Sequence, residues 1–296
     1  MNDATIQTIR PVTHNLGAFE VRRAIPTRER TMVGPFIFVD QFGPAHLPPG
    51  SAMDVRPHPH INLATVTWLF EGAIDHRDSL GSQATIRPGQ VNLMTAGRGI
   101  VHSERSPAAE RLTTQTLYGM QTWLALPDGR EDIDPAFETQ ADLPLVEDSC
   151  VQARVIMGSL WGRTAPTTQH AGTIYAEIVL AAGGALPIDS EADERAVMLV
   201  GGEAELDGTP LEPYALVVLA PGRTLRLSSA SGGRIMLLGG EAFTTPRHVW
   251  WNFVSSSRER INQAKHDWEE GRFPQVPGDS DEFIPLPRIA TTVSYP

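Results

Sequence analysis

The chain has 296 residues with 24 basic and 35 acidic side chains, which gives a formal net charge of −11. A charge of this sign repels phosphate backbones and anionic membrane surfaces, so direct nucleic-acid binding is not expected. Its single cysteine, Cys150, excludes an intramolecular disulfide, and with no visible export signal or long apolar run we expect a cytoplasmic protein without a membrane partner.

Short apolar runs alternate with turn residues along the whole chain. The 26 glycines and 24 prolines are spread throughout, a texture typical of many short strands joined by tight turns. In chain order we expect strands at residues 36–39, 63–70, 91–95, 117–126, 151–157, 174–181, 196–200, 215–219 and 234–238. The acidic, proline-rich segment 127–135 predicts a connection between an N-terminal domain, 1–135, and a C-terminal domain, 136–296.

One helix is signalled near the end of the chain, at about residues 256–271. Ser256 and Glu259 fit a capping box, and Gly271 supplies a stop. Between them a narrow apolar stripe follows at three- and four-residue spacing, formed by Ile261, Ala264, Lys265 and Trp268. The proline-rich tail beyond it, 273–296, is expected to lie extended over the body of the protein.

The two halves of the chain look like copies of one design. Residues 66–72 are similar to residues 196–202, and residues 91–97 are similar to residues 216–222. When the glycines that end these segments are aligned, four polar side chains of the first half fall on residues of the second half that cannot replace them as donors: His58 on Ile188, His60 on Ser190, His102 on Leu227 and Glu104 on Ser229. If the fold is duplicated, only the N-terminal copy should bind a metal.

Those four side chains form two pairs, His58-Pro59-His60 and His102-Ser103-Glu104. In a strand, alternate side chains point to the same face, so each pair would direct both donors into one space. Pro57 and Pro59 exclude the helical alternative for the first pair. Three imidazoles and one carboxylate converging from two strands predict a site for one divalent first-row metal.

The motifs around these donors resemble the pirin family of the cupin superfamily over nearly the whole length. The resemblance is carried, in order, by Arg56-Pro-His-Pro-His60, Phe70-Glu-Gly72, Asp75-His-Arg-Asp-Ser79, Arg87-Pro-Gly89 and Met94-Thr-Ala-Gly-Arg-Gly-Ile-Val-His-Ser-Glu104. It implies an all-β bicupin, with two antiparallel β-barrel or jelly-roll domains and the C-terminal helix packed across. It also implies a metal site at His58, His60, His102 and Glu104, with iron as the metal.

The resemblance implies Fe(II), and because the donor types select only weakly among metals, Mn, Co, Ni, Cu and Zn stay as alternatives. Gln121 and Asp40 lie in strands that border the motif, where either could line a substrate pocket or hold an imidazole tautomer. For residues 75–78 a solvated loop between strands is expected, with a role at the mouth of the cavity as the alternative.

The resemblance implies quercetin 2,3-dioxygenase activity in some family members and regulation in others. Our first hypothesis is a dioxygenase that opens a flavonol with O2 and releases CO, with Glu104 accepting the proton of the substrate hydroxyl. The alternatives are an iron protein that senses redox state and regulates a protein partner, an oxygenase for another enol or phenol, and a metal-free binding module.

Overall fold

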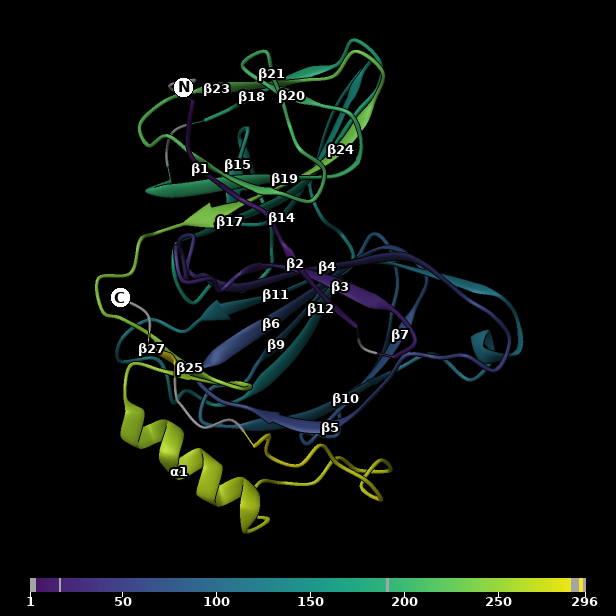
Figure 1. Cartoon of the computed structure of the whole chain (residues 1–296), viewed down its shortest axis with the longest axis vertical. Coiled ribbons are helices and arrows are strands. Elements are labelled where there is room, and N and C mark those ends of the chain that lie inside the picture. The colour runs from purple at the N-terminus through teal and green to yellow at the C-terminus, as the bar shows by residue number, and fades with distance from the viewer. Residues whose placement is uncertain (1–3, 16, 190–191, 289–292, 295–296) are drawn as a thin grey trace. The chain divides into compact units, whose positions relative to one another are not determined.

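The computed structural model describes residues 4–15, 17–189, 192–288 and 293–294 (Figure 1). The chain divides into two units that exchange segments. Unit 1 consists of Met1–Thr13, Arg22–Gln41 and Gln140–Phe243, and unit 2 of His14–Val21, Phe42–Thr139 and Thr244–Pro296. Within the described residues the one α-helix is α1 (Arg258–Glu269), and no helix there could span a membrane. The division into domains 1–135 and 136–296 stays a prediction.

Unit 2 contains a four-stranded sheet in the order β5-β10-β7-β8. A seven-stranded sheet in the order β12-β9-β6-β11-β4-β3-β2 lies largely in this unit, and its strands β2, β3, β4 and β12 cross the division between the units. The strands are β2 (Val12–Asn15), β3 (Glu20–Ile25), β4 (Phe36–Leu47), β5 (Asp54–His60), β6 (Leu63–Glu71), β7 (Ile74–Asp78), β8 (Gln83–Ile86), β9 (Val91–Thr95), β10 (Ile100–Arg105), β11 (Gln115–Ala125) and β12 (Ala136–Gln140), with a 3-10 turn at Glu110–Leu112.

Unit 1 repeats this design. It has a seven-stranded sheet in the order β1-β22-β19-β24-β17-β14-β13, a four-stranded sheet in the order β18-β23-β20-β21, and the small hairpin β15-β16. The strands are β1 (Thr5–Ile9), β13 (Leu145–Asp148), β14 (Val151–Met157), β15 (Ser159–Leu160), β16 (Arg163–Thr164), β17 (Thr173–Leu180), β18 (Ala185–Ile188), β19 (Glu194–Gly202), β20 (Glu205–Leu206), β21 (Thr209–Pro210), β22 (Leu216–Leu219), β23 (Leu225–Ser228) and β24 (Gly233–Gly240).

The strand orders confirm that the fold is duplicated. β18, β23, β20 and β21 follow one another as β5, β10, β7 and β8 do, and β22-β19-β24-β17 matches β9-β6-β11-β4. The two segment pairs that the sequence analysis found similar are therefore equivalent strands, β6 with β19 and β9 with β22. The predicted all-β class, the two barrels and the C-terminal helix are confirmed.

The helix α1 packs on an apolar cluster of unit 2. Its residues Ile261 and Ala264 are fully buried against Ile61, Trp250 and Phe253. Trp250 and Phe253 belong to the hairpin of β25 (His248–Trp250) and β26 (Phe253–Ser255), to which β27 (Val293–Ser294) adds a third strand. The helix begins one residue later than the predicted capping box, because the Ser257 hydroxyl, not that of Ser256, accepts the Arg260 amide.

Candidate metal centre

The two predicted motifs lie on neighbouring antiparallel strands of unit 2. His58 on β5 lies directly opposite His102 on β10, and Ile100 lies opposite His60. The register of this pair shifts between His102 and Glu104, which marks a bulge. On the other side of β10 the pairing with β7 continues without a shift, so His102 and Glu104 keep the alternation that directs both to one face.

The three histidines converge as the spacing predicted. Their ring centroids lie 4.4 Å apart for His58 and His102 and 5.0 Å apart for the two other pairs. His60 Nε2 and His102 Nε2 are 3.1 Å apart, and one nitrogen from each ring lies within 4.8 Å of the others. All three side chains are buried. This is the spacing at which one cation can contact three imidazoles.

Backbone carbonyls fix the orientation of two of these rings. The Nδ1–H of His58 donates to the Arg56 carbonyl at 2.8 Å, and that of His60 donates to the Asn252 carbonyl at 3.2 Å. Since a carbonyl can only accept, each ring presents the lone pair of Nε2 to the centre of the cluster. His102 Nδ1 is buried and has no hydrogen-bond partner within the described residues.

Burial keeps all three imidazoles neutral. It lowers the pKa of His58 to about 4, and it holds the pKa values of His60 and His102 well below their usual range. Repulsion by the neighbouring histidine His58 adds to this effect for the other two rings. A neutral imidazole is the form that binds a metal, so the cluster needs no proton release at pH 7. These residues fit a divalent transition metal.

Glu104 lies on the same face and is buried, with 3% of its surface exposed. Its Oε1 accepts a hydrogen bond of 2.9 Å from Nε2 of Gln121 on β11. Burial raises the pKa of the Glu104 carboxyl, and the charge of His76 and the Gln121 hydrogen bond oppose that rise. The cluster of mutually close donors contains the three histidines without Glu104. The role of Glu104 as fourth ligand therefore stays a prediction.

The two predicted pocket residues differ in their surroundings. Gln121 holds Glu104, so it contacts the carboxylate rather than an imidazole. Asp40, in the part of β4 that belongs to unit 1, accepts two hydrogen bonds from Arg23, of 2.9 and 2.8 Å. A role for either residue in substrate binding stays a prediction.

The loop expected at residues 75–78 was wrong, because these residues belong to strand β7. His76 and Asp78 are buried, and His76 Nε2 lies 3.1 Å from Asp78 Oδ2. The His76 ring stacks on Phe137 at 4.3 Å, and its centroid lies 5.4 Å from that of His102. The sequence of β7 did not look like a strand because its residues are charged. They can lie in a buried strand because His76 and Asp78, which point inward, interact with each other.

In unit 1 the positions equivalent to the three histidines are apolar, and Ser229 stands at the position of Glu104. Leu227 lies opposite Leu186, and Leu225 opposite Ile188, so Leu186 and Ile188 occupy the places of the two histidines of β5. These places are two residues earlier than the sequence alignment put them, because the connection from β18 to β19 is longer. Ser190 lies outside the described residues. Leu186, Ile188 and Leu227 are buried in one apolar core.

Sequence reasoning missed the Asn252 carbonyl. Its contact with His60 joins residues 192 positions apart, and a backbone carbonyl leaves no signal in residue type. Gly97, with φ +50°, lies in a turn where a side chain would meet the Ile133 carbonyl. That turn leads into β10 and so into His102.

Comparison with known proteins agrees with this arrangement. The model of the pirin family matches residues 18–124, and that of the pirin C-terminal cupin domain matches residues 175–274. A pirin-like protein of Caulobacter vibrioides is 46% identical over 278 residues, which cover 92% of this chain and 96% of the relative. The crystal structure of a quercetin 2,3-dioxygenase from Acinetobacter baumannii matches with a TM-score of 0.91 and 34% identity, over 98% of each chain.

A bacterial pirin of Escherichia coli, solved in complex with nickel(II), shares the fold with a TM-score of 0.65 and 17% identity, over 80% of this chain and 99% of that one. The two matched domains fall on the two copies of the duplicated fold, and the motifs that first suggested the relationship lie on the strands that carry the histidine cluster. On these grounds the chain belongs to the pirin family.

Proposed function

We propose that this protein is a metal-dependent dioxygenase that cleaves flavonols such as quercetin with O2 and releases CO. The observation that carries the proposal is the cluster of three buried, neutral histidines beside the buried carboxylate of Glu104. The similarity to a quercetin 2,3-dioxygenase over the full chain supports the choice of substrate class. The proposed substrate is a small aromatic enol or phenol, and the proposed compartment is the cytoplasm.

His58, His60 and His102 would hold the metal through their Nε2 atoms, with Glu104 proposed as the fourth ligand. A divalent ion, with Fe(II) proposed, would supply Lewis acidity toward the substrate hydroxyl and redox chemistry with O2. The protein contributes the orientation of the rings. The Arg56 and Asn252 carbonyls hold two of them in the tautomer that ligation requires.

Glu104 is the proposed proton acceptor. Burial raises the pKa of its carboxyl, which makes the carboxylate a stronger base than an exposed one. The Gln121 amide stabilises the ionised form and fixes the direction of Oε1. Glu104 therefore would take the proton of the substrate hydroxyl, and the flavonolate formed would react with O2 to give a ring-opened ester and CO.

The test begins with elemental analysis of the purified protein, followed by O2 uptake, quercetin loss and CO release on the same sample. We expect equal amounts of O2 consumed and CO formed. A fully metal-loaded protein that leaves quercetin intact and forms no CO contradicts the proposed activity. A panel of flavonols and simpler phenols then ranks the alternative substrates.

Glu104→Gln isolates the base. It should retain some metal, and turnover per bound metal should fall by about 100-fold or more, the usual contribution of a general base. Glu71→Gln, which changes an exposed glutamate of β6 in the same way, is the matched control and should leave turnover unchanged. Turnover of Glu104→Gln at the native rate would assign the proton transfer to another group.

A further inference from the structure

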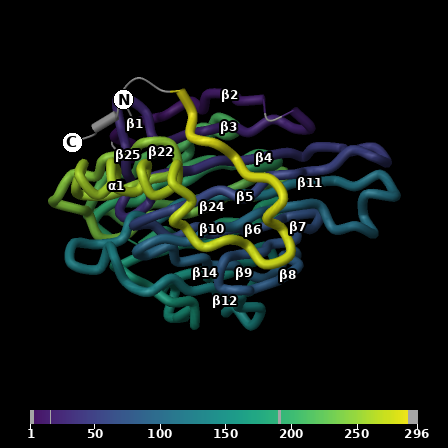
Figure 2. Tube along the Cα trace, turned by 90° about the horizontal axis from the view of Figure 1, so that it is seen from below, coloured from purple at the N-terminus to yellow at the C-terminus, as the bar shows by residue number. Residues whose placement is uncertain are grey.

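The segment that follows α1 lies across the outer side of the strands that carry the histidines (Figure 2). The Ile284 amide donates to the Pro57 carbonyl at 2.9 Å, which ties the tail to β5 immediately before His58. The Trp268 indole donates to the Ile284 carbonyl at 3.0 Å, which ties it to the helix. The tail is therefore fastened at both its helix side and its sheet side.

One carboxylate of the tail, that of Asp279, accepts hydrogen bonds from two residues of β10. Asp279 Oδ2 accepts from the Ser103 hydroxyl at 2.7 Å and from Arg105 Nε at 2.8 Å, while Oδ1 accepts from Arg105 Nη2 at 2.8 Å. Since side chains alternate along a strand, Ser103 and Arg105 point away from the face that carries His102 and Glu104. Asp279 thus holds the residues on either side of Glu104 in the sequence.

These bonds lie where the pairing of β10 with β5 changes register. Between His102 and Glu104 the facing strand β5 has one residue more than β10, so the ladder with β5 is irregular there, while the pairing of β10 with β7 continues. Bonds from a third segment can fix the backbone there. Ser103 is almost fully buried, and 11% of the Asp279 side chain is exposed, so water competes little for these bonds.

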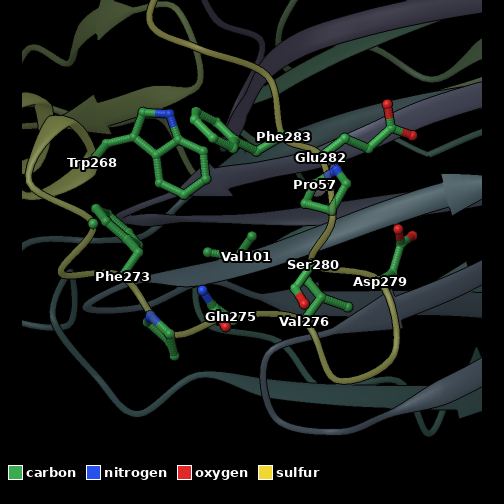
Figure 3. A pocket seen from close by; sticks show the side chains of 12 residues that line it. Pro57, Val101, Trp268, Phe273, Gln275, Val276, Asp279, Ser280, Glu282 and Phe283 are labelled. Atoms are coloured by element: carbon green, nitrogen blue, oxygen red, sulfur yellow. The ribbon is translucent and has the colours of Figure 1, made fainter.

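Beside these bonds the tail and the strands enclose a pocket. This pocket, of about 140 Å³, lies between part of the tail and the strands. Figure 3 shows Pro57 and Val101, the neighbours of His58 and His102, on its floor, with Trp268 and Phe273 at one end and Asp279 at the other. At the Asp279 end of this pocket, charged hydrogen bonds join the tail to β10.

We propose that Asp279 is a positioning residue for the metal site. Through Ser103 and Arg105 it fixes the segment of β10 that faces the bulge of β5, and so the directions of His102 and Glu104. The inference rests on the proposed metal site but not on the proposed substrate. It assigns to the C-terminal tail a part in metal binding that the N-terminal motifs do not reveal.

The test is titration of the metal-free protein with Co(II), followed by its visible absorption spectrum, which reports the geometry of the ligands. Asp279→Ala is expected to weaken Co(II) binding by about 10-fold, the lower end for loss of a supporting partner, and to change the spectrum. Asp281→Ala, two residues along the same tail and exposed, is the matched control and should match the unaltered protein.

The outcomes separate the two proposals. If the unaltered protein gives no Co(II) spectrum, the metal site itself is wrong. If it binds and Asp279→Ala gives the same affinity and spectrum, only the positioning role is wrong, as it is if Asp281→Ala causes an equal change. If Asp279→Ala does not fold, Ser103→Ala is the second variant, because it removes one of the three hydrogen bonds. It should still shift the Co(II) spectrum. An unshifted spectrum contradicts the proposal.

Discussion

The histidine cluster shows what a single residue type can do when its surroundings hold it in one protonation state and one tautomer. Burial keeps His58, His60 and His102 neutral, and carbonyls direct two of them. The spacing of His58, His60 and His102 on two strands predicted the convergence of the three rings, because strand geometry fixes the face of each side chain. The Asn252 and Asp279 contacts could not be predicted, since they depend on where distant segments fold back.

Removing one of the converging imidazoles tests the ligand set. His60→Ala should weaken metal binding by more than about 100-fold, beyond the loss expected for a supporting partner. His46→Ala, which removes an exposed histidine of β4, should bind metal normally. Metal content measured after dialysis distinguishes them, and equal content in both variants would remove His60 from the site.

The pH dependence of the metal-free protein follows from the same burial. The pKa of His58 is about 4 in the folded chain against an ordinary 6.5, so the unfolded chain binds more protons between these values. The free energy of unfolding should be constant above about pH 6.5 and fall as the pH drops towards 4, by roughly 3 kcal/mol for this residue alone. Urea unfolding at pH 7 and pH 5 measures this fall. A protein that is as stable or more stable at pH 5 than at pH 7 contradicts the assignment.

At the scale of elements, periodicity predicted the apolar strands and the helix well, but polar strands were concealed. The segment Asp75-His-Arg-Asp78 was expected to be a loop because its residues are all ionisable. It is the strand β7, since His76 and Asp78 bond to each other inside the fold. The helix start was displaced by one residue, because the Ser256 hydroxyl donates to Glu131 and leaves the cap to Ser257.

That cap is directly testable. Ser257→Ala removes the acceptor of the Arg260 amide and should lower the free energy of unfolding by about 1 kcal/mol, the usual value for an N-cap. Ser257→Asn, whose side chain can accept the same hydrogen bond, should lower the free energy of unfolding much less. Thermal and urea unfolding of the two variants give the comparison, and equal losses would show that the hydroxyl is not the cap.

At the scale of the molecule, one fold appears twice and one copy has kept the donors. The duplication was readable from the sequence, because equivalent strands share apolar runs that end in glycine. The exact alignment of the two copies could not be read from the sequence, because the connection from β18 to β19 is longer than that from β5 to β6. The exchange of segments between the units also left no local signal, as it depends on pairings such as β1 with β22.

A stoichiometry follows from the difference between the copies. We expect one transition metal per chain, because Leu186, Ile188 and Leu227 replace the histidines in unit 1. Elemental analysis against protein concentration checks this, and the double variant His58→Ala, His102→Ala should contain none. Two ions per chain, or one that survives the double substitution, would place a site outside the cluster.

The contact between His60 and the Asn252 carbonyl has a consequence for the order of biosynthesis. The two residues are 192 positions apart, so at ordinary translation speeds of 5–20 residues per second the ribosome reaches the second roughly 10 to 40 s after the first. A nascent chain that has released only the His-Pro-His segment holds an imidazole with no fixed orientation. The orientation that the proposed metal site requires is therefore complete only after translation of the final fifth of the polypeptide, which supplies the Asn252 carbonyl.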